Sequence, residues 1–193
     1  PVPSKNVPTF HKDWQPLAFV SNWGGMEIGS GMMYPANVID GLVHQLGGWR
    51  LQVEIALLSQ RQQKCPVGKA VVTSPGGLDL KEKFDFIIHT TPPFYDHPPL
   101  FTTPSSGLRS CYQSSFQVIE NLQNKDNNRK IAVPLVGAGA RGFPVDEAIS
   151  IAAQESTRWR ETGTPKGEET IAFGILEEYD ATRLAKAIQD AEF

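Results

Sequence analysis

The chain has 193 residues, which suits one domain with a sizeable hydrophobic core. Its formal net charge of -3 provides no broad positive field, so we expect neither sequence-specific nucleic-acid binding nor association with an anionic membrane. No apolar run is long enough to span a bilayer. Two cysteines, Cys65 and Cys111, are too few for a disulfide framework and favour a reducing compartment, cytoplasmic or nuclear.

The proline-rich residues 1–15 are expected to form an extended N-terminal segment, followed by a single domain over residues 16–193. Five apolar runs in that domain predict strands, at residues 17–20, 70–73, 84–88, 131–136 and 171–176. The last two lack strict alternation, which is typical of strands covered on both faces. Pro134 has no N–H to donate, so a bulge or a strand end is expected near it.

Helical periodicity appears between the strands, at residues 39–46, 108–122, 145–152 and 184–191. In the first helix the apolar stripe runs through Ile39, Leu42, Val43 and Leu46. The second helix is expected to follow a turn and cap over residues 104–107, and the last to have its N-cap at Asp180. Alternating strands and helices predict a three-layer α/β/α sandwich with a mixed, mainly parallel central sheet.

A glycine loop (residues 137–143) lies between a predicted strand and a predicted helix. Gly137, Gly139 and Gly142 match the pattern G-x-G-x-x-G, and Pro144 suits the first position of the following helix. Glycine permits positive φ and close approach of the backbone, while N–H groups at a helix start favour an anion. The loop therefore predicts a phosphate site; a tight turn that binds nothing is the alternative.

The glycine loop does not fit the dinucleotide-binding fingerprint. That fingerprint opens a βαβ unit and has an acidic residue about 20 positions later. Here the loop follows the fourth predicted strand, and Glu177 lies roughly 35 residues beyond the last loop glycine, too far for this rule.

Four stretches, in this order along the chain, resemble motifs of the macro domain family. Residues 40–48 (DGLVHQLGG) are similar to its first-helix pattern D-G-A-I-H-x-x-x-G, and residues 65–73 (CPVGKAVVT) to its C-x-x-G-x-A-x-x-T strand. Residues 86–93 (FIIHTTPP) resemble its I-I-H-T-V-G-P segment, and residues 134–148 its second phosphate loop. The resemblance covers residues 16–193.

The resemblance implies an α/β/α module that binds ADP-ribose or an ADP-ribosylated macromolecule, as a monomer and without a cofactor or metal. It implies that the diphosphate lies between residues 36–41 and the glycine loop. The family's Asn-Ala-Ala-Asn stretch has no direct counterpart; Asn22 is the candidate for its first asparagine, and Asn37 lies near the helix entry. The ligand-binding residues implied in this way are Asn22, Asn37, Val38, Gly137, Ala138, Gly139, Ala140, Arg141, Gly142 and Phe143.

Asp40 and His44 are four residues apart and therefore share one face of the first helix. A carboxylate there suits activation of water for attack at a distal ribose, with the histidine sharing the proton. Hydrolases of the family use an acid at the position that matches Asp40. The alternative is an exposed helix pair, with the acid placed favourably for the helix dipole.

Other polar and aromatic side chains have two interpretations each. His89 ends an apolar run, so a hydrogen-bonded core histidine is favoured over a catalytic one. Arg141 either contacts a phosphate or is a solvated loop charge. Phe94 and Tyr95 either line a nucleotide pocket or pack within their own loop. In the resembled family, an apolar or aromatic residue at the position of Phe143, the tip of the loop, packs on the distal ribose.

Three functions remain open from the sequence. The first is an ADP-ribosyl hydrolase that uses Asp40. The second is a reader that binds ADP-ribose without turnover, which the altered asparagine stretch favours. The third is a macro-like domain that binds another nucleotide or a protein partner.

Overall fold

A computed structural model of the chain describes residues 39–60, 65–96, 103–122, 129–162 and 169–192. The predicted segment 1–15, the predicted strand 17–20 and the candidates Asn22, Asn37 and Val38 lie outside these ranges. The chain divides into two compact units, Pro1–Pro66 with Val71–Thr91, and Val67–Ala70 with Pro92–Phe193.

The first unit contains α1 (Ile39–Gln60), β1 (Ala70–Thr73, whose first residue groups with the second unit), α2 (Leu78–Lys81) and β2 (Ile87–Thr90). β1 and β2 pair in a two-stranded sheet. β1 has the bounds predicted from sequence, whereas β2 begins three residues later than its apolar run. Phe84 and Phe86 of that run are exposed, so they extend the apolar pattern without extending the strand.

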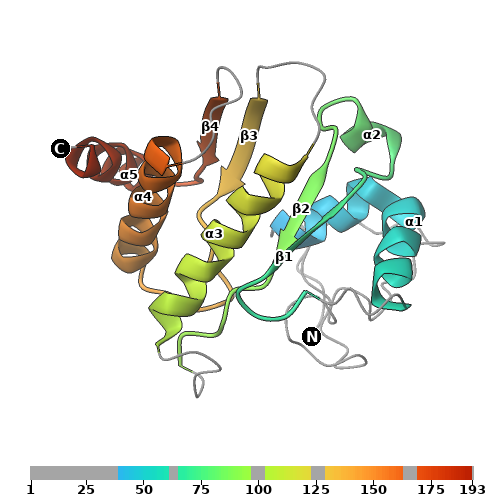
Figure 1. The fold of residues 1–193 in the computed structure, drawn as a ribbon, viewed down its shortest axis with the longest axis horizontal. Helices are drawn as coiled ribbons and strands as arrows, with labels where there is room; N and C mark the ends of the chain where they lie inside the picture. Colours follow the sequence, from blue (N-terminus) through green and yellow to red (C-terminus); the bar gives the residue numbers. More distant parts are fainter. Residues whose placement is uncertain (1–38, 61–64, 97–102, 123–128, 163–168, 193) are drawn as a thin grey trace, which may run out of the picture. The chain divides into compact units, whose positions relative to one another are not determined.

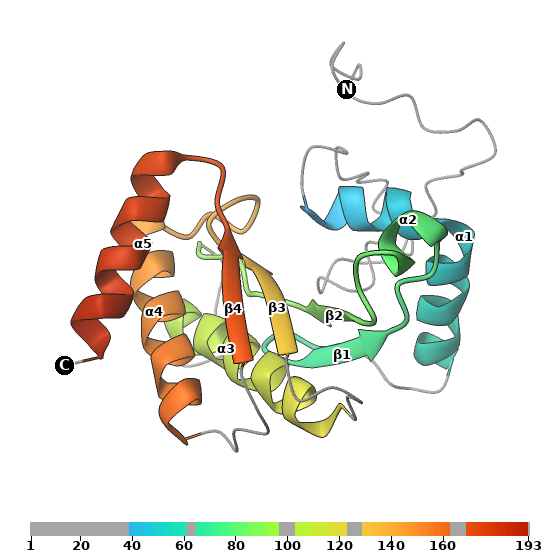
Figure 2. The ribbon, with the colours of Figure 1, turned by 90° about the horizontal axis from the view of Figure 1, so that it is seen from above.

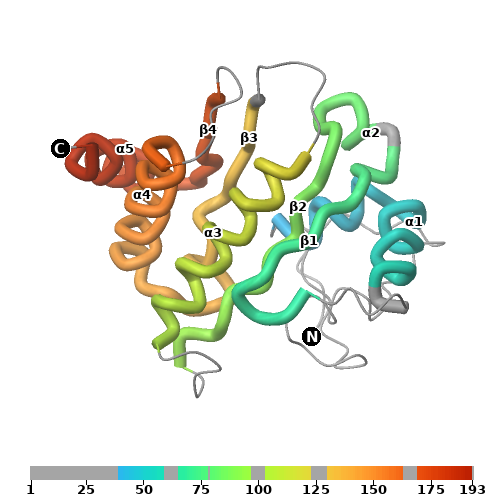
Figure 3. The backbone as a smooth tube through the Cα atoms, in the orientation of Figure 1, coloured from blue at the N-terminus to red at the C-terminus, as the bar shows by residue number. Residues whose placement is uncertain are grey.

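α1 is broken at Gly48, where φ is 59° and ψ is -157°, and Figure 3 shows the change in its direction. Gly76 and Gly77 approach this break closely. A Cβ at Gly77 would lie 2.3 Å from the carbonyl oxygen of Leu46, and one at Gly76 would lie 2.7 Å from that of Gly47. Glycines on both segments are therefore what allows the two backbones to meet.

The apolar stripe predicted for the first turns of α1 is confirmed only in part, because Val43 packs against the core whereas Ile39 and Leu42 are 56% and 41% exposed. His44, which is not part of the stripe, is buried. The buried side of this half of the helix also carries Gly41 and Gly47, which lack side chains and permit close packing. Beyond the break, Leu51 and Ile55 form a core cluster with Cys65.

The second unit contains α3 (Pro104–Asn121), β3 (Arg129–Pro134), α4 (Val145–Thr162), β4 (Glu169–Gly174) and α5 (Glu178–Ala191). β3 and β4 are parallel, in register from Arg129 opposite Glu169 to Pro134 opposite Gly174, and lie side by side in Figure 1. Both strands begin and end two residues before the predicted runs. The strand end expected near Pro134 is confirmed.

The two predicted helix starts in this unit need correction. Residues 104–107 form the first turn of α3 rather than a preceding turn, because Thr103 caps the helix: its hydroxyl accepts from the N–H of Ser106, whose hydroxyl accepts from the N–H of Thr103. The N-cap of α5 is Glu177, not Asp180. Asp180 lies in the first turn, where its carboxylate accepts from Arg183 at 3.0 Å.

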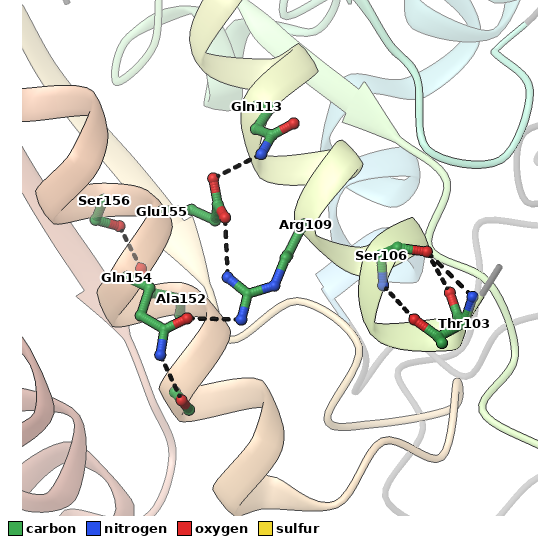
Figure 4. A network of polar contacts seen from close by, with 9 residues as sticks. Thr103, Ser106, Arg109, Gln113, Ala152, Gln154, Glu155 and Ser156 are labelled. Carbon is green, nitrogen blue, oxygen red and sulfur yellow. Dashed lines mark hydrogen bonds and ion pairs between the residues drawn. The ribbon is translucent and has the colours of Figure 1, made fainter. Parts of the chain in front are cut away.

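α4 packs between α3 and α5, as Figure 2 shows. A buried carboxylate joins α3 to α4: Glu155 accepts from Arg109 at 3.0 Å and from Gln113 at 2.9 Å (Figure 4). Beside it, the rings of Phe116 and Trp159 stack at 4.6 Å. Apolar packing and satisfied polar groups thus hold α4, the helix that follows the glycine loop, against α3. None of the helices in the described ranges is long and apolar enough to cross a membrane.

Candidate functional site

The glycine loop has a closed conformation that two glycines with positive φ make possible. Gly137 has φ of 88° and Gly142 has φ of 75°. The N–H of Gly142 donates to the oxygen of Gly139 at 2.9 Å, and the N–H of Phe143 donates to the oxygen of Gly137 at 3.2 Å. Because side chains are strained at such φ values, the glycine positions are required by the shape of the turn.

Four further amides of the loop have no hydrogen-bond partner within the described part of the chain. The N–H groups of residues 137–140 take no part in the hydrogen bonds among the residues that the structure describes. Gly139 and Ala140 are exposed. The loop runs directly into α4, which begins at Val145; the oxygen of Pro144 accepts from the N–H of Ala148 at 3.0 Å, so Pro144 precedes the helix rather than being its first residue. Unused amides before a helix start are the arrangement that binds anions.

Phe143 is buried beneath the glycine loop, packed against Gly137, and does not lie at the exposed tip expected from the sequence. Its side chain is 3% exposed, and a Cβ at Gly137 would lie 3.1 Å from its ring. The Phe143 ring meets that of Tyr95 edge to face, with centroids 5.3 Å apart. Its contact with a ribose stays a prediction, whereas its packing role is established.

Arg141 does not fit the alternative of a solvated loop charge. Its side chain is half-buried, and its guanidinium lies over the ring of Phe94, 4.4 Å from the centroid. Its carbonyl oxygen accepts from the N–H of Tyr95 at 2.9 Å. Phe94 and Tyr95 therefore pack on the glycine loop rather than only within their own loop, and a contact of either ring with a nucleotide stays a prediction.

Sequence reasoning missed two residues that join this arrangement. Glu147, in the first turn of α4, accepts from the hydroxyl of Ser105, which lies in the first turn of α3. The charge of Glu147 raises the pKa of the Tyr95 hydroxyl. No local pattern pointed to Ser105 and Glu147, because they come from stretches far apart in the sequence.

In the first unit, Asp40 and His44 are brought together, with 3.6 Å between the carboxylate Oδ1 and the ring Nε2. The alternative of an exposed pair is wrong for the histidine: His44 is 1% exposed, whereas the Asp40 side chain is 45% exposed. Burial lowers the pKa of His44, and the nearby Asp40 charge opposes that shift. His44 is therefore a neutral imidazole at pH 7, and within the described ranges neither ring nitrogen has a hydrogen-bond partner.

His89 is a hydrogen-bonded histidine of the fold, as predicted. Its Nε2 lies 2.8 Å from the hydroxyl of Thr73, and its carbonyl accepts from the thiol of Cys65 at 3.6 Å. Burial, and then the proximity of His44, lower the pKa of His89 to about 3. The two histidine rings lie 6.4 Å apart. Among the described residues, no group of three acidic, histidine or cysteine side chains is arranged to hold a metal.

Comparison with known proteins places these features in a family. The family model described as "Macro domain" matches residues 30–152. A macro domain-containing protein of Caldanaerobacter subterraneus is 28% identical over 157 residues, 80% of this chain and 81% of the relative. The O-acetyl-ADP-ribose deacetylase of Klebsiella pneumoniae is 29% identical over 143 residues, 74% of this chain and 75% of the relative.

Among solved structures, the Oceanobacillus iheyensis macrodomain with ADP matches with a TM-score of 0.61 at 22% identity, over 80% of this chain and 74% of that one. This likeness confirms the α/β fold class predicted from the alternation of strands and helices.

Proposed function

Because the chain belongs to the macro domain family, we propose that it binds ADP-ribose or a derivative of it, with the diphosphate held at the glycine loop. The observation that carries this proposal is the row of amides at residues 137–140, shortly before α4, which donate to no other residue that the structure describes. The ligand-bound relative contains ADP, whose diphosphate is the group this loop suits.

The loop offers three contributions to binding an anion. The amides can donate to an anion without breaking a hydrogen bond to any described residue, so binding of the anion requires little reorganisation of this part of the loop. The start of α4 adds the positive end of a helix dipole. Arg141 adds a full positive charge from within the loop, held by the ring of Phe94.

Calorimetric titration with ADP-ribose, ADP and adenosine tests the proposal. We expect saturable binding of ADP-ribose and ADP, and binding of adenosine at least tenfold weaker because it lacks the diphosphate. Equal affinities for all three, or no binding of any, would contradict the proposal.

We further propose that the chain hydrolyses an ADP-ribosyl linkage, with the Asp40 carboxylate orienting the attacking water. Asp40 is accessible, and its carboxylate lies 3.6 Å from Nε2 of the buried His44 ring on the same face of α1. Asp40→Asn retains the size of the side chain but not its basicity. We expect release of ADP-ribose from a peptide ADP-ribosylated on a glutamate side chain to fall at least 100-fold, the usual range for loss of a general base, with affinity for ADP-ribose within about threefold of wild type.

The alternative of a reader without turnover is decided by the same assay. If wild type and Asp40→Asn release ADP-ribose at the same slow rate while both bind it, the hydrolase proposal is wrong and the reader remains.

We also propose that the protein acts as a monomer on ADP-ribosylated macromolecules of the cytoplasm or nucleus. Light scattering after gel filtration, with and without ADP-ribose, tests the monomer.

A further inference from the structure

We propose that Tyr112, in the middle of α3, is a positioning residue of the glycine loop: its hydroxyl holds the amide of Val136, the residue at which the chain enters the loop. The inference rests on the proposed function in one respect, because the loop is taken to receive a diphosphate. The hydrogen bond itself is a property of the protein without ligand.

This hydrogen bond lies just beyond the end of a strand. β3 ends at Pro134, opposite Gly174, so the amide of Val136 is past the last paired residue of the parallel ladder. The Tyr112 hydroxyl accepts from that amide at 3.2 Å. The next residue, Gly137, has a φ of 88°, the first of the two positive φ values that shape the loop. A restraint at Val136 therefore fixes the point from which the loop turns.

A second side chain of α3 supports the residue that follows. Leu108 is four residues before Tyr112, on the same face of the helix, and is fully buried. A Cβ at Gly137 would lie 3.2 Å from the Leu108 side chain. The loop also closes on Gly137, whose oxygen accepts from the N–H of Phe143 at 3.2 Å. Leu108 and Tyr112 thus support two consecutive residues where the loop begins.

The Tyr112 side chain is itself held in place by the packing of α3 on α4. It is 2% exposed, and its ring lies 6.3 Å from that of Phe116, which stacks on Trp159 of α4. Burial raises the pKa of the Tyr112 hydroxyl, so the group remains neutral throughout the pH range of a binding experiment. The position of its oxygen is therefore set by the two helices rather than by the loop.

The amides assigned to the diphosphate, those of residues 137–140, come directly after the restrained residue. Amides that already point toward an anion bind it more tightly than amides that must first be ordered. Loss of the Tyr112 hydroxyl would leave the Val136 amide without its acceptor and release the start of the loop. Affinity should therefore fall, although the buried tyrosine supplies no group to the ligand.

The first test compares affinities in Tyr112→Phe, which keeps the ring and removes the hydroxyl. We expect ADP-ribose to bind about fivefold more weakly, the order expected for one hydrogen bond, and adenosine to bind within twofold of wild type. Trp159→Phe is the matched control, because it removes a buried hydrogen bond between the same two helices, from Nε1 to Glu120 near the end of α3, at 2.8 Å. This control should bind ADP-ribose within twofold of wild type.

The second test measures amide hydrogen exchange by NMR in the protein without ligand. We expect the amides of Val136 and Phe143 to exchange about fivefold faster in Tyr112→Phe, with those of α5 unchanged. A general loss of stability would accelerate the amides of α5 as well. Wild type alone gives a further reading: because the loop closes only on a restrained start, Val136 should be protected at least as strongly as Phe143.

The two tests separate the two proposals. If wild type fails to bind ADP-ribose, the proposed function is wrong, and the exchange rates still decide whether Tyr112 positions the loop. The positioning role is overturned if Val136 is unprotected in wild type, or if Tyr112→Phe leaves the exchange of Val136 and Phe143 unchanged. It is also overturned if Tyr112→Phe binds ADP-ribose as wild type does, or if Trp159→Phe loses as much affinity as Tyr112→Phe.

Discussion

At the scale of single residues, Gly139 is a position where we expect a substitution to weaken ligand binding without lowering the stability of the fold. A Cβ there would meet no atom within 4 Å, so the turn itself does not require glycine at this point. Its neighbours in the loop are the amides that we assign to the diphosphate. A branched side chain would occupy the open space beside them.

We expect Gly139→Val to weaken ADP-ribose binding at least tenfold, with the free energy of unfolding changed by less than about 1 kcal/mol, as for an open surface site. Calorimetry and urea denaturation measure the two quantities. Gly174→Val is the control, since a Cβ at Gly174 also meets nothing within 4 Å. Equal affinity of Gly139→Val and Gly174→Val would place the ligand elsewhere.

At the scale of elements, the break in α1 depends on glycines of a different segment. The Cβ that an alanine would add at Gly77 falls 2.3 Å from the backbone oxygen of Leu46, which has no flexible end to move aside. We expect Gly77→Ala to lower the free energy of unfolding by about 1–3 kcal/mol, the usual cost of overpacking. Gly139→Ala, which adds the same methyl group in open space, is the control in the same denaturation series. A Gly77→Ala variant as stable as that control would show that the approach of these segments is not tight.

Periodicity predicted the existence of most described elements but not their ends. The strand at residues 70–73 was predicted without error, because its apolar run has the length of the strand. The start of α3 was mistaken for a turn, since its capping box uses Ser106 in place of the usual glutamate or glutamine. The buried face of α1 was also mistaken: two small glycines and a histidine are buried there, and none of them counts as apolar in a periodic pattern.

At the scale of the whole molecule, four motifs predicted the family and the fold class. They are informative because they occur in the same order along the chain as in the family. The glycine loop was predicted as well, since the loop is continuous in sequence. The hydrogen bond from Ser105 to Glu147 escaped prediction. It depends on two segments that are far apart in sequence meeting in space, which no local spacing encodes.

The stability of the whole protein should depend on pH through its two neighbouring histidines. The pKa of His89 falls from an ordinary 6.5 to about 3 in the folded state, and that of His44 is also lowered. Below pH 6.5 the unfolded chain therefore binds protons that the folded chain excludes. Stability is complete above pH 6.5 and is lost as the pH falls from there toward 3.

For His89 alone the slope approaches about 1.4 kcal/mol per pH unit within this window. Urea denaturation at pH 7, 6 and 5 measures it, in a range where most carboxylates remain ionised. His89→Gln retains a side chain able to hydrogen-bond to Thr73 but does not titrate, so its curve should be flatter than that of wild type by up to this slope. Parallel curves for the two proteins would mean that His89 takes up its proton in the folded state as readily as in the unfolded chain, and that the burial of this pair does not exclude the charge.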